Sequence, residues 1–207
     1  MKIPLGKRYT LFLLLLVAQL SVAGKPPSSV WRLGIPVWLG AVAASNVAGA
    51  DSFSLGSGSS GEVISNEITL RWNGESGYHF SDDFWLSSYQ QFSYTMWQVE
   101  GLKLSHDTAN NTIDFIQGFR WNFADYRLLS YVDTSLGLSL QANEKVGDIK
   151  LGDSLQFTEY TGLGGYFTPR WRWDFGVRHY SNNYMHRDNN GVNFYRFIIS
   201  YNYQKAD

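Results

Sequence analysis

The sequence predicts an all-β protein: an eight-stranded antiparallel transmembrane β-barrel that follows an N-terminal signal peptide. From residue 51 onward, apolar and polar side chains alternate with a period of two rather than 3.6. The alternation recurs in eight segments of roughly ten residues, which is typical of the strands of membrane barrels. The chain of 207 residues suits one domain, and its 13 Tyr, 13 Phe, 8 Trp and 20 Gly favour a β-rich wall with aromatic girdles.

The composition excludes several classes of function. The chain has no cysteine, which excludes a disulfide scaffold, thiolate chemistry and a cysteine-ligated metal. Its formal net charge of -1 provides no electrostatic reason to expect a nucleic-acid partner. The histidines outside the segment 171–181 lie in expected loops without ligand spacing, so we expect no metal centre and no cofactor.

The N-terminus predicts an export signal over residues 1–23. Basic residues precede a short apolar run, and a small-residue cleavage site ends at Ala23. The run is too short to favour a membrane anchor. Residues 24–50 resemble a second signal-like segment, so they are either a mature extension or a sign that the true start lies downstream. On either account we expect the barrel to occupy residues 51–207.

The first three expected strands cover residues 52–58, 62–72 and 84–98. The first is short and leads into a Gly/Ser-rich turn that ends at Gly61. The second alternates Ile, Leu and Trp with Ser, Glu, Thr and Arg, and the third is long and combines aromatic residues with Ser and Gln. Each of the two longer segments is therefore expected to have one apolar and one polar face.

The next three expected strands cover residues 112–123, 130–140 and 156–167. The first alternates Ile, Phe and Trp with Asp, Gly, Arg and Asn, and the second sets Val and Leu against Asp, Ser and Gly. The third is rich in glycine, which relieves crowding in a small barrel.

The last two expected strands cover residues 171–181 and 192–203. In each, aromatic and aliphatic residues share one face. Charged residues share the opposite face, and we expect four of them to form a network inside the barrel: Arg172, Asp174, Arg178 and Arg196.

A soluble β-sandwich would show the same alternation. Its hidden face, however, would not hold so many Trp and Tyr, whereas a lipid-facing wall with interfacial belts would. A closed barrel also leaves no backbone edge unpaired in lipid. With the export signal, this favours the outer membrane of a Gram-negative bacterium.

A histidine and a serine, His179 and Ser181, lie two residues apart near the end of an expected strand. Their side chains therefore point to the same face, where an imidazole beside a hydroxyl can activate a serine nucleophile. Asn193 has the parity of the apolar face of the last strand, and in a hairpin closed between residues 182 and 192 it would lie near Ser181. Polar residues on a lipid-facing wall are costly and indicate function. The alternative is an ordinary polar pair at the water interface, with Asn193 a simple strand-start residue.

The sequence Arg-His-Tyr-Ser-Asn at 178–182, followed by Asn-Asn-Gly-Val-Asn at 189–193, resembles the lipid A 3-O-deacylases of the PagL type. These proteins are eight-stranded outer membrane barrels. The resemblance covers about residues 51–203 and becomes specific in the last hairpin. It implies that His179 and Ser181 act with an acidic residue on the next strand, that the outer wall presents this site to the membrane, and that the enzyme hydrolyses the ester-linked acyl chain at the 3-position of lipid A.

Two positions depart from the family pattern. The family's acidic residue falls on Asn193, and a glycine that normally follows His-x-Ser-Asn by one residue is replaced by Tyr184. Outer membrane phospholipase A, a larger barrel, resembles this stretch in using His, Ser and Asn at this spacing. An amide oxygen can orient the imidazole but cannot stabilise imidazolium by charge, so we expect weaker activity. Asp188 in the connecting loop is an alternative acid, and the tyrosine affects the oxyanion hole.

The resemblance implies a role for each polar residue. Ser181 attacks the ester carbonyl, His179 accepts and returns the proton, and Asn193 orients the imidazole. Asn182 and Asn189 are the candidates for stabilising the oxyanion.

The leading hypothesis is a serine esterase that removes the 3-O-linked acyl chain of lipid A. Its partners are then lipopolysaccharide as substrate and the surrounding outer membrane lipid, with no nucleic acid; a monomer and a homodimer both stay open. The alternatives are a phospholipid deacylase, which the asparagine favours, and a non-catalytic structural barrel.

Overall fold

The computed structural model describes residues 49–74, 77–123 and 128–203. The chain divides into two units, and every described strand belongs to the second unit, which starts at Ser52. The predicted signal peptide at 1–23 and nearly all of the segment 24–50 lie outside the described residues, so these boundaries stay predictions.

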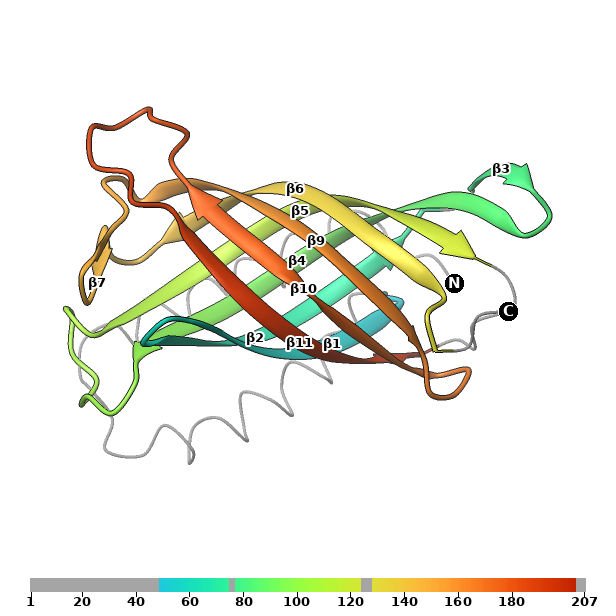
Figure 1. Cartoon of the computed structure of the whole chain (residues 1–207), viewed down its shortest axis with the longest axis horizontal. Coiled ribbons are helices and arrows are strands. Elements are labelled where there is room, and N and C mark those ends of the chain that lie inside the picture. The colour runs from blue at the N-terminus through green and yellow to red at the C-terminus, as the bar shows by residue number, and fades with distance from the viewer. Residues whose placement is uncertain (1–48, 75–76, 124–127, 204–207) are drawn as a thin grey trace. The chain divides into compact units, whose positions relative to one another are not determined.

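Eight long antiparallel strands close into a barrel (Figure 1). They are β1 (Ser52–Ser60), β2 (Val63–Asn73), β4 (Phe84–Val99), β5 (Ala109–Phe123), β6 (Tyr131–Gln141), β9 (Leu155–Tyr166), β10 (Trp171–Ser181) and β11 (Val192–Asn202). Each pairs with the next along the chain, and β1 completes the wall by pairing with β11. The predicted fold is confirmed, and each predicted strand overlaps one of the eight.

Three short strands add to the barrel and were not predicted. β3 (Tyr78–Ser81) forms a hairpin with the start of β4, and β7 (Lys145–Val146) pairs with β8 (Ile149–Lys150) in the connection between β6 and β9. A strand of two to four residues is too short for its alternation to stand out in the sequence. In the described part of the chain, we find no helix with the length and hydropathy needed to cross a membrane.

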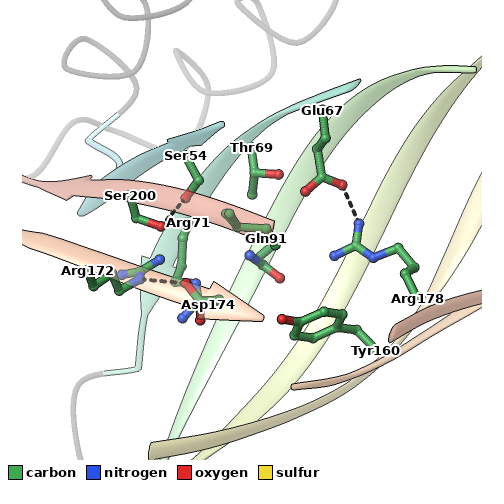
Figure 2. Close-up of a pocket in the computed structure, with 11 residues that line it drawn as sticks. Ser54, Glu67, Thr69, Arg71, Gln91, Tyr160, Arg172, Asp174, Arg178 and Ser200 are labelled. Carbon is green, nitrogen blue, oxygen red and sulfur yellow. Dashed lines mark hydrogen bonds and ion pairs between the residues drawn. The ribbon is translucent and has the colours of Figure 1, made fainter. Parts of the chain in front are cut away.

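The interior of the barrel is filled by polar and charged side chains (Figure 2). Its buried charged residues are Glu67, Arg71, Asp114, Arg120, Asp133, Arg172, Asp174, Arg178 and Arg196. Asp133 accepts two bonds from Arg120, at 2.8 and 2.7 Å, and one from Arg71 at 3.2 Å. Such buried ions are tolerated when each carboxylate is paired with a guanidinium, and the other buried carboxylates also lie within 3.6 Å of one.

The predicted inward network is therefore confirmed, with one difference in pairing. The carboxylate of Asp174 lies 3.6 Å from Nε of Arg172, and Figure 2 marks this ion pair with a dashed line. Arg178 and Arg196 instead donate to Glu67, and the Arg196 bond is 2.7 Å long. Barrel closure decides this pairing, because Glu67 comes from β2, on the other side of β1.

The outer face carries the apolar halves of the strands. Aromatic rings gather at one end of the barrel, where Phe84 stacks 6.1 Å from Trp121 and Trp171 packs edge-on 5.0 Å from Tyr201. Large apolar side chains remain exposed along the middle of the wall: Phe115, Phe119, Leu136, Leu138, Leu163, Phe175 and Phe197. A band of exposed apolar residues with an aromatic girdle is the surface expected of a barrel in lipid.

The other end of the barrel is closed by an apolar cluster. Its buried members are Val63, Trp97, Val99, Val146, Leu151, Tyr180, Val192 and Phe194. The rings of Trp97 and Tyr180 lie 4.9 Å apart. Val146, between β6 and β9, belongs to the cluster, so the unpredicted β7–β8 hairpin packs on the inner side of β10 and β11. This packing fixes the ends of both strands.

Candidate active site

His179 and Asn193 face each other across β10 and β11. The two residues are direct partners in the register, and Nδ1 of His179 lies 2.7 Å from Oδ1 of Asn193. Because an amide oxygen only accepts, Nδ1 carries the hydrogen, and in the neutral imidazole the lone pair is then on Nε2. The sequence predicts that Asn193 lies near Ser181. In the structure its direct partner across the strands is His179.

Ser181 is the last residue of β10 and lies on the same face as His179. Both side chains are half-buried, and they alternate with Tyr180 and Asn182, which are completely buried on the inner side. The serine hydroxyl and the imidazole thus point away from the lumen. Their partners across β9 are Phe157 for Ser181 and Glu159 for His179.

Asn182 was expected to stabilise the oxyanion through its backbone or side-chain amide, and both groups donate to other acceptors in the structure. Its Nδ2 donates to the carbonyl oxygens of Leu151 at 2.9 Å and Asp188 at 2.8 Å, and its backbone N–H donates to Oδ1 of Asn189 at 3.2 Å. The reason is that successive side chains point to opposite faces, so the side chain at position 182 points to the inner side at the end of the barrel, whereas Ser181 points outward. Asn182 instead fastens the loop between β10 and β11.

Asn189 is the other oxyanion candidate. Its side chain is half-buried, and its oxygen is occupied by the Asn182 N–H. The amide NH₂ projects away from that oxygen and is the group that would donate to an oxyanion.

Gly191 is a site residue that the sequence reasoning did not single out. Its φ of +60° lies in the left-handed region, and an added Cβ would lie 3.1 Å from Cε1 of His179. The backbone therefore passes directly beside the imidazole. The neighbouring Asn190 N–H donates to the Lys150 carbonyl at 3.0 Å, so the β7–β8 hairpin also supports this loop. The Asn-Gly pair at 190–191 was the available signal, since it marks a tight turn.

The geometry agrees with the comparisons with known proteins. Residues 65–202 match the family model described as lipid A 3-O-deacylase (PagL). The chain belongs to the PagL family of lipid A 3-O-deacylases.

A known PagL protein and a solved PagL structure are similar to this chain. The lipid A deacylase PagL of Pseudomonas aeruginosa is 25% identical over 130 residues, which cover 62% of this chain and 72% of that protein. A crystal structure of the outer membrane enzyme PagL superposes with a TM-score of 0.66 at 22% identity, covering 73% of this chain and 99% of the other. At this identity the superposition supports the barrel fold.

The backbone at Tyr184 accounts for the glycine of the PagL pattern. Tyr184 has a φ of 60° and the preceding Asn183 a φ of 50°. Both values lie in the left-handed region, which glycine adopts without steric cost. The tyrosine side chain is 85% exposed, so its packing offsets little of this strain.

Restoring that glycine is expected to stabilise the protein. Tyr184→Gly should raise the free energy of unfolding by about 1 kcal/mol. A non-glycine residue in this region is strained by about 1–3 kcal/mol, and glycine offsets part of the relieved strain because it increases the conformational entropy of the unfolded chain. Urea unfolding in detergent micelles, followed by tryptophan fluorescence, measures the change. The matched control is Met185→Gly, an exposed neighbour without a positive φ. A midpoint that falls equally in both variants would contradict the strain at Tyr184.

The alternative acid, Asp188, lies in a different part of the loop. Its recorded contacts are with Asn182 and His186, and it lines a shallow depression with Lys145 and Lys150. None of these contacts is with His179, so the structure does not support Asp188 as the replacement for the family's carboxylate. Within residues 49–74, 77–123 and 128–203, no group of three His, Cys, Asp or Glu is arranged to hold a metal ion.

Proposed function

We propose that this PagL-family barrel is a serine esterase of the outer membrane that removes the 3-O-linked acyl chain of lipid A through Ser181, His179 and Asn193. The observation that carries the proposal is the 2.7 Å bond between Nδ1 of His179 and Oδ1 of Asn193, which orients the imidazole on the outer wall, on the face of Ser181. A substrate whose acyl chains lie in the bilayer meets the barrel from that side.

The first half of the reaction transfers the acyl chain to the enzyme. Oγ of Ser181 bonds to the ester carbonyl carbon as its proton moves to Nε2 of His179, and the carbonyl oxygen becomes an oxyanion. When the oxyanion collapses, the bond from that carbon to the 3-oxygen of the sugar breaks. The sugar oxygen takes the proton from His179, which leaves a free 3-hydroxyl and an acylated serine.

The second half releases the fatty acid. A water molecule gives a proton to Nε2 of His179 while its oxygen bonds to the acyl carbon. The bond from that carbon to Oγ of Ser181 then breaks, and Oγ recovers the proton from His179. Throughout both halves, Asn193 holds the ring in one tautomer and one orientation.

The position of the site near a strand end suits a lipid with a polar head. Ser181 ends β10, so the scissile ester would lie close to the membrane surface. The acyl chain would run along the apolar wall toward the middle of the barrel, where Phe175 and Phe197 are exposed. Burial of that chain against the wall is a non-directional, area-dependent contribution to binding.

The direct test is the lipid A mass spectrum of a Gram-negative host that expresses the protein. Loss of one 3-hydroxyacyl chain supports the proposal. Unchanged lipid A with new lysophospholipid would support the phospholipase alternative, for which Asn193 is the specific argument. If neither product appears, the result would support the alternative of a non-catalytic structural barrel.

A homodimer is a further proposal, which light scattering of the protein in detergent tests.

Replacing Asn193 tests the orientation of the imidazole. Asn193→Ala is expected to lower kcat about 10²-fold, because the ring loses the acceptor that fixes its tautomer. Steady-state release of fatty acid from purified lipid A measures the effect. Gln90→Ala, an exposed polar residue on the outer face of β4, is the matched control and should retain full activity. A kcat equal to that of the control would refute the role of Asn193.

A further inference from the structure

The charged side chains of the barrel strands divide sharply between the two faces. Every Arg, Asp and Glu of the eight long strands but one is buried inside the barrel. The exception is Glu159 in β9, whose side chain is exposed on the outer face between those of Phe157 and Thr161. A lone carboxylate on a lipid-facing wall is unfavourable, so its presence indicates a function.

Glu159 lies directly beside His179. The register makes them partners across β9 and β10, which run side by side in Figure 1, while Asn193 is the partner of His179 on the opposite side. Cβ atoms of facing residues on one side of an antiparallel pair lie about 4.5–5.5 Å apart, so the flexible glutamate side chain can reach the imidazole. Among the described residues, Glu159 has no hydrogen-bond or ion-pair partner that would hold it elsewhere.

We propose that Glu159 is the acidic partner of His179, so that the carboxylate of this site stands on β9 instead of β11. This inference rests on the proposed function. In the PagL pattern one acidic residue both orients the histidine and supplies negative charge. Here the two tasks would be divided between residues on two strands. Asn193 orients the ring through its 2.7 Å bond, and Glu159 supplies the negative charge that an amide lacks. Glu159 acts through His179 and is a positioning residue.

The charge is needed at one stage of the reaction. When His179 takes the proton of Ser181 it becomes imidazolium, and a carboxylate one strand away stabilises that cation. The attraction between the two charges is stronger at a lipid-facing wall than in water, because the effective dielectric constant is lower. Since imidazolium forms only as the substrate reacts, Glu159 should affect kcat more than KM.

The test is the variant Glu159→Gln in the full-length protein, folded in detergent micelles with purified lipid A. We expect kcat to fall about tenfold or more while KM changes less than about twofold. Thr161→Val, at the next outward position of β9, is the matched control and should keep the wild-type kcat. An unchanged kcat in Glu159→Gln would overturn the proposal.

A second variant, with a carboxylate on β11, distinguishes the loss of negative charge from a structural effect of Glu159→Gln. Adding Asn193→Glu to Glu159→Gln places the acid on the other side of the imidazole, and we expect it to recover at least about half of the kcat lost by Glu159→Gln. A folded double variant no more active than Glu159→Gln would show that the loss is not one of charge. The resistance of Glu159→Gln to urea should equal or exceed that of the wild type, since a lipid-facing charge is removed; a lower resistance would assign Glu159 a structural role.

Ser181→Ala in the same assay distinguishes this inference from the proposed function. If Ser181→Ala is inactive and Glu159→Gln is fully active, only the role of Glu159 fails. If Ser181→Ala retains the wild-type rate, the serine mechanism itself fails, and the inference about Glu159 fails with it.

Discussion

Replacing Ser181 with alanine is expected to abolish the release of the 3-O-linked acyl chain while leaving the barrel folded. Removal of the nucleophile of a serine hydrolase lowers kcat by about 10⁶-fold, because no acyl-enzyme can form. The side chain is half-buried at the end of β10 and makes no contribution to the inner packing, so the fold should tolerate the loss of one hydroxyl. The lipid A mass spectrum of a host that expresses the variant should therefore equal that of a host without the protein.

The control for this experiment is Ser57→Ala. Ser57 is an exposed serine on β1, and its removal should leave the deacylated lipid A at the wild-type level. Heat-modifiable migration on gels reports whether each variant forms a closed barrel. Deacylation by a folded Ser181→Ala variant at the wild-type level would rule out Ser181 as the nucleophile.

Replacing Glu67 with leucine is expected to lower the free energy of unfolding by about 3–5 kcal/mol, the usual cost of removing one partner of a buried ion pair. Glu67 is buried and accepts bonds from Arg178, Arg196 and Thr95. Without the carboxylate, two guanidinium groups lose their direct partner in a space that water scarcely enters. Urea unfolding of the protein in lipid vesicles measures the change.

Glu62→Gln is the matched variant for that measurement. Glu62 immediately precedes β2 and its side chain is exposed, so the loss of its charge should change the unfolding free energy by less than about 0.5 kcal/mol. Equal unfolding midpoints for Glu67→Leu and Glu62→Gln would contradict the structural role of the inner network. Because Arg178 precedes His179, any loss of activity in Glu67→Leu should be compared with the fraction of protein that is folded.

Much of the barrel could be predicted because the alternation of a strand is local. The segment 171–181 shows this clearly: Trp173 and Phe175 had to share one face, and Arg172 and Asp174 the other. The same parity placed His179 and Ser181 together on the outer face. The short strands β3, β7 and β8 escaped prediction because two to four residues do not establish a period.

Asn182 is a residue whose role could not be predicted from its type and its position in the sequence. Its place next to Ser181 suggested an oxyanion donor, but its parity turns it inward, where it bonds to the carbonyls of Leu151 and Asp188. Those partners lie in loops whose conformation has no periodic signature in the sequence. The same applies to Gly191, whose closeness to the imidazole depends on the path of the loop.

The amino-acid order by itself determined which residues form strands and which face of each strand meets lipid, because both follow from the two-residue repeat of an extended chain. Only the tertiary structure decided which residues meet across neighbouring strands, because register depends on loop lengths and on closure of the whole sheet. Thus the outward direction of Glu159 and His179 could be read from the chain, whereas their position side by side, with Asn193 on the far side of the ring, required the closed barrel.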